Sequence, residues 1–415
     1  MVYVKGFKAI RPKKDLANKV AALPYDVMSS SEARKMVEGN PYSFLHVDRA
    51  EIDLDEDTNI YDKKVYEKAR ENLYNMLNND VLIQDSKECL YIYRLIMNGR
   101  IQTGLVVAAS IDDYLNNKIK KHEYTREEKE RDRINHVDYC DANTGPIFLT
   151  YKKNDRVSSI IEEWTNNYKP EYDFVAQDGI THMVWVINDS DKVNELLELY
   201  KDLDSLYIAD GHHRCASAAK VALMRRRENP DYLGMEPFNY FLSVVFPDEE
   251  LNIMDYNRVV KDLNGLTDLG FLKRVKESFF VEEYKNIGCF KPEERNSFGM
   301  YLNNKWYVLR AKDTIVNNDD LVERLDVSIL QNYLLDPILG IKDPRKDDRI
   351  DFVGGIRGLE ELEKRVEDGM KVAFSMYPTS IKELMDIADN DKVMPPKSTW
   401  FEPKLRSGLF VHKLK

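Results

Sequence analysis

The segment Leu206–Lys220 constrains the fold of this chain more narrowly than any other. It begins with a short apolar run, Leu206–Ala209, continues through Asp210-Gly211, and enters an alanine-rich stretch at His212. An apolar run of this length that is bounded by a glycine turn is typical of a strand, and the stretch that follows is typical of a helix. We therefore predict a strand that passes directly into a helix at Gly211.

The same turn has the chemistry of an anion site. Glycine at a strand-to-helix turn lets backbone amides approach a ligand closely, and the first turn of a helix offers unpaired N–H groups at the positive end of its dipole. Arg214 adds a planar fork that suits phosphate or carboxylate, and Asp210 can hold a metal ion or accept a proton. We expect phosphate to be bound by Gly211, His212, His213 and Arg214.

The composition favours a folded protein with little affinity for nucleic acids. The chain has 415 residues, of which 43% are hydrophobic, and this length suits two or three domains of roughly 100–200 residues each. The formal net charge of −11 disfavours nucleic-acid binding, which depends on neutralising phosphates. A basic pocket is therefore more informative here than in a basic protein.

The sequence also favours a cytoplasmic protein without a membrane partner. The first ten residues lack the layout of a signal peptide, and no window approaches the roughly 18 apolar residues of a membrane helix. Cys89, Cys140, Cys215 and Cys289 show neither a pairing pattern nor zinc-type spacing. We expect them to be reduced thiols.

The predicted elements mix hairpins with strand–helix units, which favours an α+β fold with mixed sheets and flanking helices. Asn98-Gly99 lies between two apolar runs and is the strongest two-residue hairpin signal. Phe44–Val47 is a short strand candidate. We divide the chain into an N-terminal α+β domain over residues 1–152, a phosphate-binding domain over 153–290, and a C-terminal α+β region with a basic proline-rich loop over 291–415.

A second charged segment, Lys120–Arg133, is predicted to contain the start of a helix. Thr125 and Glu128 match a capping box, so this helix should begin just after Tyr124. Residues 120–123 then lie at the mouth of its N-terminus, where anions are favoured.

Four residues of this segment have chemistry beyond surface charge. Glu123 is a carboxylate that can deprotonate a hydroxyl nucleophile, and His122 lies beside it in the sequence. Lys120 and Arg133 can neutralise a phosphoryl group during its transfer. A capped surface helix whose charges pair with one another is the alternative, above all for residues 127–132.

The third segment of interest is a basic, proline-rich loop over Met394–Gly408. The prolines restrict its conformation, and Trp400-Phe401 indicate that it packs against the protein. A solvated tail is the alternative interpretation. We expect the loop to close over anionic groups of a substrate through Lys397, Ser398, Thr399, Lys404 and Arg406.

Several common enzyme motifs do not occur in the sequence. It contains no Walker-type lysine loop, no Rossmann Gly-x-Gly-x-x-Gly, no Gly-x-Ser-x-Gly and no His-Glu-x-x-His. This argues against most standard ATPases, dehydrogenases, esterases and zinc proteases. Phosphate binding would then depend on the turn at Gly211.

Four short motifs, spread over most of the chain, resemble the family catalogued as domain of unknown function 1015 (DUF1015). They are Pro24-Tyr25-Asp26, Lys121-His122-Glu123 with Thr125, Ala209–Arg214 and Pro396–Lys404. In addition, Asp210–Arg214 is similar to the phosphate loop of the ParB/sulfiredoxin-like fold. That resemblance implies a ParB/sulfiredoxin-like core in the phosphate-binding domain, and the fold includes kinases that phosphorylate free L-serine.

The resemblance implies a phosphotransferase that moves a phosphoryl group from ATP, ADP or pyrophosphate to the hydroxyl of a small metabolite, with free L-serine as the best guess. Mg²⁺ is the expected cofactor, with Asp210 as its ligand, and Glu123 is the expected general base. Two alternatives stay open. One is a metal-dependent phosphohydrolase with His122, His212, His213 and Asp210 as ligands, and the other is a non-catalytic nucleotide-binding regulator.

Overall fold

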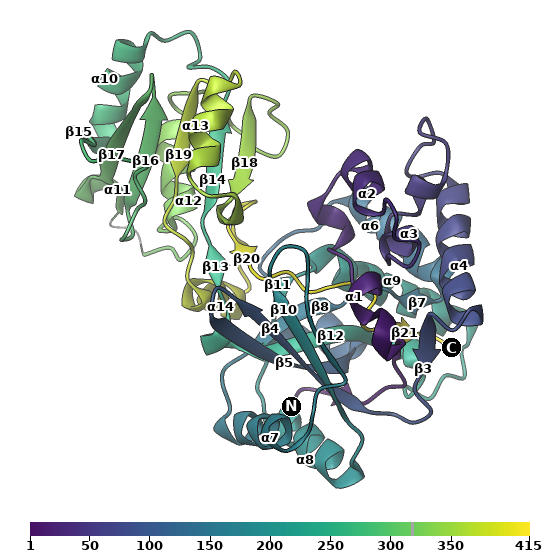
Figure 1. Ribbon diagram of the computed structural model, residues 1–415. Helices are drawn as coiled ribbons and strands as arrows, with labels where there is room; N and C mark the ends of the chain where they lie inside the picture. The colour runs from purple at the N-terminus through teal and green to yellow at the C-terminus, as the bar shows by residue number, and fades with distance from the viewer. Residues whose placement is uncertain (317–318) are drawn as a thin grey trace. The chain divides into compact units, whose positions relative to one another are not determined.

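The chain forms two compact units. The computed structural model describes residues 1–316 and 319–415. The first unit comprises Met1–Leu251 together with Pro403–Lys415, and the second unit comprises Asn252–Glu402 (Figure 1). The second unit is therefore inserted between two parts of the first.

A nine-stranded sheet forms the centre of the first unit. Its strands lie in the order β6-β11-β8-β12-β5-β4-β10-β9, and β1 pairs with β5. The sheet is mixed, because β11 runs parallel to β6 but antiparallel to β8. Its strands are β1 (Val4–Lys5), β4 (Leu90–Met97), β5 (Arg100–Ser110), β6 (Ile119–Lys120), β8 (Ile147–Tyr151), β9 (Tyr172–Val175), β10 (Thr181–Ile187), β11 (Leu206–Asp210) and β12 (Tyr240–Pro247).

Helices cover this sheet, and two of them, α7 and α8, lie side by side at one of its faces (Figure 1). Alternate side chains of β4 and β5, such as Ile92 and Leu105, pack in one cluster with Ile160 of α7, Leu199 of α8 and Ala218 of α9. The helices of the first unit are α1 (Ala17–Val20), α2 (Ser30–Met36), α3 (Leu45–Asp48), α4 (Lys63–Asn78), α5 (Ile111–Leu115), α6 (Glu127–Cys140), α7 (Asp155–Asn167), α8 (Ser190–Lys201) and α9 (His212–Glu228).

The C-terminal residues of the chain belong to the first unit. Ser407 bridges to Ala22 and Val411 to Ile10, and β21 (His412–Lys413) pairs with β7 (Ala142–Asn143). Another small sheet pairs β2 (Ile10–Pro12) with β3 (Leu82–Gln84). These pairings fix the segment 403–415, which we call the C-terminal strap, along the N-terminal part of the unit.

The second unit has its own six-stranded antiparallel sheet, in the order β15-β17-β16-β19-β14-β18. Val259, Trp306, Val353, Leu362 and Ala373 form the buried centre of one cluster against it. The elements of this unit are β13 (Ile253–Met254), β14 (Tyr256–Val260), α10 (Asp268–Ser278), β15 (Phe279–Glu283), β16 (Ser297–Leu302), β17 (Lys305–Ala311), α11 (Asp313–Val316), α12 (Asp326–Leu330), β18 (Ile350–Gly354), α13 (Glu360–Glu367), β19 (Val372–Ser375), α14 (Ile381–Asp389) and β20 (Trp400–Phe401).

The predicted α+β class with mixed sheets and flanking helices is confirmed. The two units, however, differ from the three segments predicted from the sequence. Residue 152 separates β4 and β5 from β10 and β12, and these four strands pair within one sheet, so a boundary there would divide a continuous core. Composition does not reveal such pairing, because it depends on contacts between distant segments.

One short element was predicted wrongly. Phe44–Val47 was expected to be a strand, but Leu45–Asp48 form helix α3. Phe44, Leu45 and Val47 are all buried, and a four-residue apolar run does not distinguish a buried strand from a buried helix. The turn at Asn98-Gly99 does join β4 to β5 as predicted, with φ of 51° and 78° at its two residues.

All four cysteines are unpaired. Among the helices of the described part of the chain, none has both the length and the apolar character that crossing a bilayer requires.

Candidate functional site

The predicted strand-to-helix turn is present. β11 ends at Asp210, Gly211 has a φ of +98°, and α9 begins at His212. No side chain caps the start of α9, so its first N–H groups have no partner from a capping side chain. A backbone with this φ is one that glycine adopts without strain, which explains the glycine at the turn.

Two neighbouring strands place further segments beside this turn. β6 runs parallel to β11, so the residues that follow β6, from Lys121 onward, leave the sheet at the same edge as Gly211. β8 runs antiparallel to β11, with Asp210 opposite Phe148, so the residues that precede β8, Gly145-Pro146, also lie at this edge. Three segments far apart in the sequence thus surround the start of α9.

Arg214 is held in the first turn of α9 by backbone and carboxylate groups. Its Nη1 donates to the carbonyl of Pro146 over 2.5 Å, and its Nη2 lies 3.9 Å from Oδ1 of Asp210. Burial opposes its charge, but Asp26 and Asp210 outweigh burial and raise the pKa of Arg214. The guanidinium is therefore a fixed cation next to the uncapped helix start.

His122 and His212 form a pair of neutral imidazoles beside Arg214. Their ring centroids lie 4.4 Å apart at an interplanar angle of 87°, and the backbone N–H of His122 donates to Nε2 of His212 over 3.4 Å. Burial lowers the pKa of His122 to about 4 and that of His212 well below its usual value. Because Nε2 of His212 accepts a hydrogen bond, the ring proton of neutral His212 resides on Nδ1.

The Nδ1–H group of His212 faces the carboxylate of Glu123. Nδ1 of His212 lies 4.0 Å from Oε2 of Glu123, whose side chain is 44% exposed. This separation is longer than a hydrogen bond, and the carboxylate of Glu123 stays accessible to solvent. The role of Glu123 as a general base stays a prediction.

Asp210 is unsuited to accept a proton. Lys404 of the C-terminal strap donates from Nζ to Oδ2 of Asp210 over 2.9 Å. Although burial favours the neutral acid, Lys404 and Arg214 hold the pKa of Asp210 well below its ordinary value. A carboxylate with so low a pKa is a weak base, and here it faces two cations, Lys404 and Arg214.

Arg214 also lines a small cavity of about 20 Å³, together with Tyr25, Arg133, His136 and Thr144. The guanidinium of Arg133 lies over the ring of Tyr25 at 3.9 Å from its centroid and 2.8 Å from Oδ2 of Asp132. Arg133, one of the predicted phosphate-binding residues, is thus a second buried cation in this wall of the site.

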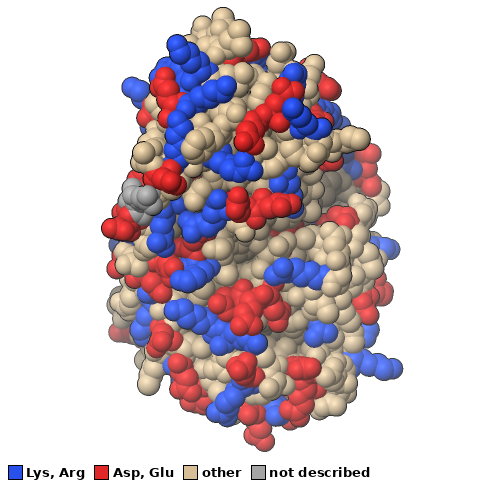
Figure 2. All heavy atoms as spheres, turned by 90° about the vertical axis from the view of Figure 1, so that its left-hand side faces the viewer, with Lys and Arg blue, Asp and Glu red and all other residues tan. Residues whose placement is uncertain are grey.

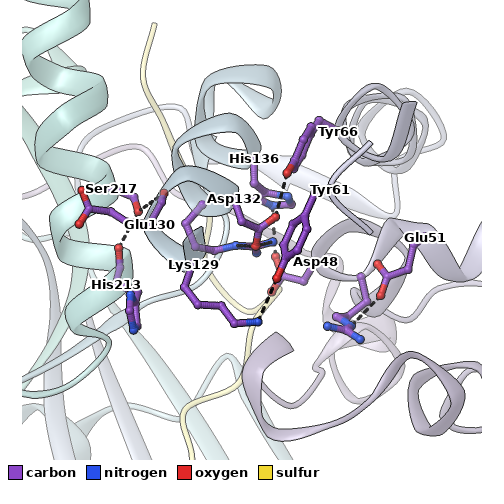
Figure 3. Close-up of polar contacts among 12 residues, drawn as sticks. Asp48, Glu51, Tyr61, Tyr66, Lys129, Glu130, Asp132, His136, His213 and Ser217 are labelled. Atoms are coloured by element: carbon purple, nitrogen blue, oxygen red, sulfur yellow. Dashed lines mark hydrogen bonds and ion pairs between the residues drawn. The ribbon is translucent and has the colours of Figure 1, made fainter. Parts of the chain in front are cut away.

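A chain of hydrogen bonds fixes the far side of this cavity. Thr144 donates to Asp48 over 2.7 Å, and Nε2 of His136 lies 3.1 Å from the Thr144 hydroxyl and 3.6 Å from Asp48. Figure 3 shows His136 and Asp132 on α6, between Asp48 and Tyr66. Burial lowers the pKa of His136, but Cys140 and Asp48 outweigh it and raise the pKa to about 9.

Three buried nitrogen atoms around the start of α9 have no hydrogen-bond partner in the described part of the chain. They are Nε of Arg214, Nδ1 of His213 and Nδ1 of His122. Buried polar atoms in native proteins almost always have a partner in the protein, in water or in a ligand. His213 and Arg214 lie in the first turn of α9, and His122 lies in the segment that follows β6, so these nitrogens are available to polar groups of a ligand.

The positive charge around the start of α9 does not reflect the overall charge of the chain, which is −11. Figure 2 shows acidic and basic side chains interspersed over the face that it presents. The cations of the site are instead collected by the fold, since Arg133, Arg214 and Lys404 come from α6, α9 and the C-terminal strap.

Most of the predicted site residues therefore lie in the first unit. The structure groups His122, Glu123, Arg133, Lys404 and the turn Asp210–Arg214 around the start of α9. Lys120, in β6, pairs with Tyr207 of β11. The bonding roles that the sequence predicted for them stay predictions.

Arg406 is engaged by the protein. It is 3% exposed, its Nε donates to Nε2 of His182 over 3.2 Å, and its Nη2 is hydrogen-bonded to Asp178. These contacts anchor the C-terminal strap and so position Lys404. Contact of Arg406 with a substrate remains a prediction.

Lys397, Ser398 and Thr399 lie in the second unit. Ser398 donates to the carbonyl of Pro395 over 2.5 Å, and Thr379 donates to the carbonyl of Ser398 over 2.9 Å. The loop is thus folded against its own unit, as the aromatic pair Trp400-Phe401 indicated. That these three residues bind substrate remains a prediction.

The donor set fits a magnesium ion that arrives with phosphates better than a preformed metal centre. Within residues 1–316 and 319–415, no group of three or more His, Cys, Asp or Glu side chains is arranged to hold a metal. Nε2 of His212 is engaged by the amide of His122, which counts against the histidine-ligated alternative. Mg²⁺ commonly takes only one or two carboxylates when phosphates and water complete its shell, and Asp26, Asp210 and Asp48 are the carboxylates that act on Arg214.

Sequence reasoning gave too little weight to one group of residues. Tyr25 packs on Arg133, Asp26 acts on Arg214 and His213, and Gly145-Pro146 confine the Arg214 side chain. The motif Pro24-Tyr25-Asp26 was the available signal. Gly145-Pro146 carries no pattern that would distinguish it from an ordinary turn.

The comparison with family models agrees with the resemblance to DUF1015. The model of the family described as "Protein of unknown function (DUF1015)" matches residues 4–328. The chain is similar to three solved structures: a mutant of free serine kinase in complex with AMP, with 15% identity over 74% of this chain and 89% of that one (TM-score 0.37); SbnI with C-terminal truncation from Staphylococcus aureus, with 10% identity over 72% and 82% (TM-score 0.39); and a conserved hypothetical protein from Pyrococcus furiosus, with 16% identity over 73% and 93% (TM-score 0.34). No curated protein matches the chain.

Proposed function

The chain belongs to the family of proteins of unknown function DUF1015, and from this premise we propose that it is a small-molecule kinase whose phosphate donor binds at the start of α9. The observation that carries the proposal is Arg214. Its buried guanidinium is clamped beside an uncapped helix N-terminus, and its Nε lacks a partner in the described chain. A phosphate oxygen would satisfy both the helix amides and this nitrogen.

The proposal assigns the following roles to the side chains around the start of α9. Arg133, Arg214 and Lys404 neutralise the phosphates, and neutral His122 and His212 contribute hydrogen bonds without charge. Glu123 accepts the proton of the acceptor hydroxyl, with His212 as its positioning residue. Mg²⁺, held by the nucleotide and Asp210, supplies further neutralisation of phosphate oxygens when bound.

The first acceptor to test is free L-serine, because the motif Asp210–Arg214 is similar to that of kinases for this amino acid. ATP, ADP and pyrophosphate are the donors to compare. A cytoplasmic location, where these donors and acceptors are available, is part of the proposal. So is the assignment of Lys397, Ser398, Thr399 and Arg406 to the anionic end of the substrate.

Phosphorus NMR of the full chain with each donor, magnesium and a panel of hydroxyl amino acids tests the proposal. Phosphoserine, or another phosphomonoester, is the expected product. Glu123→Gln should lower turnover by roughly 10²–10⁴ and leave nucleotide affinity within about twofold, while Arg214→Ala should weaken both. Glu127→Gln is the matched control, because Glu127 is an 85% exposed carboxylate of the same segment.

The results separate the remaining alternatives. Equal turnover in Glu123→Gln and the wild-type chain would remove Glu123 from the mechanism. Nucleotide binding without a product from any donor–acceptor pair would favour the non-catalytic regulator. Stoichiometric zinc, iron or manganese in the purified chain would favour the phosphohydrolase.

A further inference from the structure

The second unit contains a cleft that the proposed function does not use. It encloses about 380 Å³, and its lining includes Arg258, Lys342, Phe352, Pro395 and Pro396. All of its lining residues belong to the second unit. A cleft of this size is within the range that holds small molecules.

Arg258 is the buried charged residue of the cleft lining. It is 3% exposed, and its Nη1 and Nη2 donate to the backbone carbonyls of Tyr256 and Lys397, the second over 2.9 Å. Within the described residues, no carboxylate forms an ion pair with it. Burial lowers the pKa of Arg258 to about 10; Tyr256 opposes this shift in part, and no carboxylate does.

A buried cation without an acidic partner is costly, so proteins rarely keep one unless a ligand or a partner charge compensates it. A guanidinium has five N–H donors, and the two hydrogen bonds of Arg258 to carbonyls use two of them. Three donors thus remain for a further acceptor. The planar fork suits the two oxygens of a carboxylate or phosphate.

The other charges of the cleft leave this positive charge uncompensated. Asp343 is the acidic side chain in the lining, and two nitrogens of Arg345 contact its carboxylate at 2.9 Å each. Lys342 is exposed at the cleft and forms no ion pair with any described residue. The cleft is therefore positive in a chain whose net charge is −11.

The wall beside Arg258 is apolar. Arg258 of β14 and Phe352 of β18 are direct cross-strand partners, and the guanidinium lies 5.6 Å from the centroid of the Phe352 ring. Pro395 and Pro396 also line the cleft. A ligand anchored on Arg258 would thus place its body against Phe352 and the two prolines.

We propose that this cleft of the second unit binds a small organic anion, whose phosphate or carboxylate group is held by Arg258 and Lys342 while its apolar or planar body contacts Phe352 and Pro395-Pro396. The site lies wholly within the second unit and does not depend on the proposed kinase activity.

Titration calorimetry of the full chain with phenyl phosphate, benzoate and inorganic phosphate tests this site. We expect phenyl phosphate or benzoate to bind, and whichever binds more tightly identifies the preferred head group as phosphate or carboxylate. Inorganic phosphate should bind more weakly because it lacks the apolar body. Arg258→Gln should weaken binding of the tighter probe by about tenfold or more. Lys342→Glu should weaken it by about three- to tenfold.

Two controls make the result specific. Arg310→Gln removes a half-exposed arginine of the same unit that pairs with Glu282 at 3.4 Å, and it should leave binding unchanged. Arg214→Ala should also leave it unchanged, which separates this site from the one at α9. If circular dichroism shows that Arg258→Gln does not fold, the binding affinities of Arg258→Lys and Lys342→Glu test the proposal instead.

The proposal is overturned by either of two results. One is that no probe binds below about 10 mM. The other is that the affinity of the tighter probe stays within about twofold of wild type in Lys342→Glu and in whichever Arg258 variant folds.

Discussion

Lys404 donates from Nζ to Oδ2 of Asp210 over 2.9 Å, which joins residues that are 194 positions apart in the chain. This ion pair brings a cation from the C-terminal strap to the turn that precedes α9. Its partner Asp210 also faces Arg214. The charge of the site thus depends on the strap being in place.

Lys404→Met is expected to lower nucleotide affinity by roughly tenfold, because it removes one charge-assisted contact to phosphate and leaves Asp210 with Arg214 alone. Equilibrium binding of the nucleotide measures this effect. Lys415→Met, at an exposed position of the same strap, is the control and should bind as wild type does. A loss of equal size in both variants would contradict a direct role for Lys404.

Gly211→Ala should damage the site through both strain and displacement. At a φ of +98° an alanine costs roughly 1–2 kcal/mol, and its Cβ would lie 3.2 Å from Nε of Arg214. Gly179→Ala is the control. Its φ is +78° and no atom lies within 4 Å of the added Cβ, so this variant introduces backbone strain without displacing a neighbouring side chain. We expect both variants to lose similar stability in urea unfolding, and only Gly211→Ala to lose nucleotide binding.

His136 should make the stability of the chain depend on pH. Its pKa is about 9 in the folded state against 6.5 for the free group, so the folded state binds the proton more tightly. The stabilisation is complete below pH 6.5 and is lost as the pH rises toward 9. Urea unfolding at pH 6, 7.5 and 9 should show a decrease of about 1–3 kcal/mol.

The variant His136→Gln isolates this contribution, because His46 also has a raised pKa, owing to Asp53, and acts in the same direction. The decrease between pH 6.5 and 9 should be clearly smaller in His136→Gln than in wild type. Equal decreases in the two proteins would show that folding does not raise the pKa of His136.

Asp26→Asn tests whether Asp26 is the general base or instead acts only through its charge on Arg214. Asp26 acts electrostatically on Arg214 and His213, so its removal should raise affinity for the phosphate donor by about two- to fivefold. Turnover should fall far less than in Glu123→Gln. If the two variants exchange these behaviours, Asp26 is the base and Glu123 is not.

The sequence predicted the turn at Gly211 well because its signals are local. A strand, a glycine with positive φ and an alanine-rich helix follow one another within 15 residues, and each has its own pattern. The hairpin at Asn98-Gly99 succeeded for the same reason, since both residues adopt the positive φ that they tolerate best.

The capping box at Thr125 failed because a longer contact competes for the same side chain. α6 begins at Glu127, two residues later than predicted, and its N-cap, Arg126, makes no side-chain cap. The hydroxyl of Thr125 donates to Glu130 over 2.7 Å. A start two residues later lengthens the loop that holds His122 and Glu123, which is the part of the site that sequence spacing could not place.

The division of the third segment was also beyond local patterns. Lys404 and Arg406 belong to the first unit, whereas Lys397 belongs to the second. No change of composition marks the boundary at Pro403. It is visible only in the pairing of the strap with Ala22 and Ile10.

The position of the C-terminal strap has a consequence for synthesis of the protein. A ribosome that has delivered Leu251 must still deliver the whole of Asn252–Glu402 before the strap emerges, which takes on the order of ten seconds at roughly 5–20 residues per second. During that interval β7 lacks its partner β21 and Asp210 lacks Lys404. The first unit therefore begins to form before the second unit but is completed after it. An anion that binds at Gly211 during this interval would do so without the charge of Lys404.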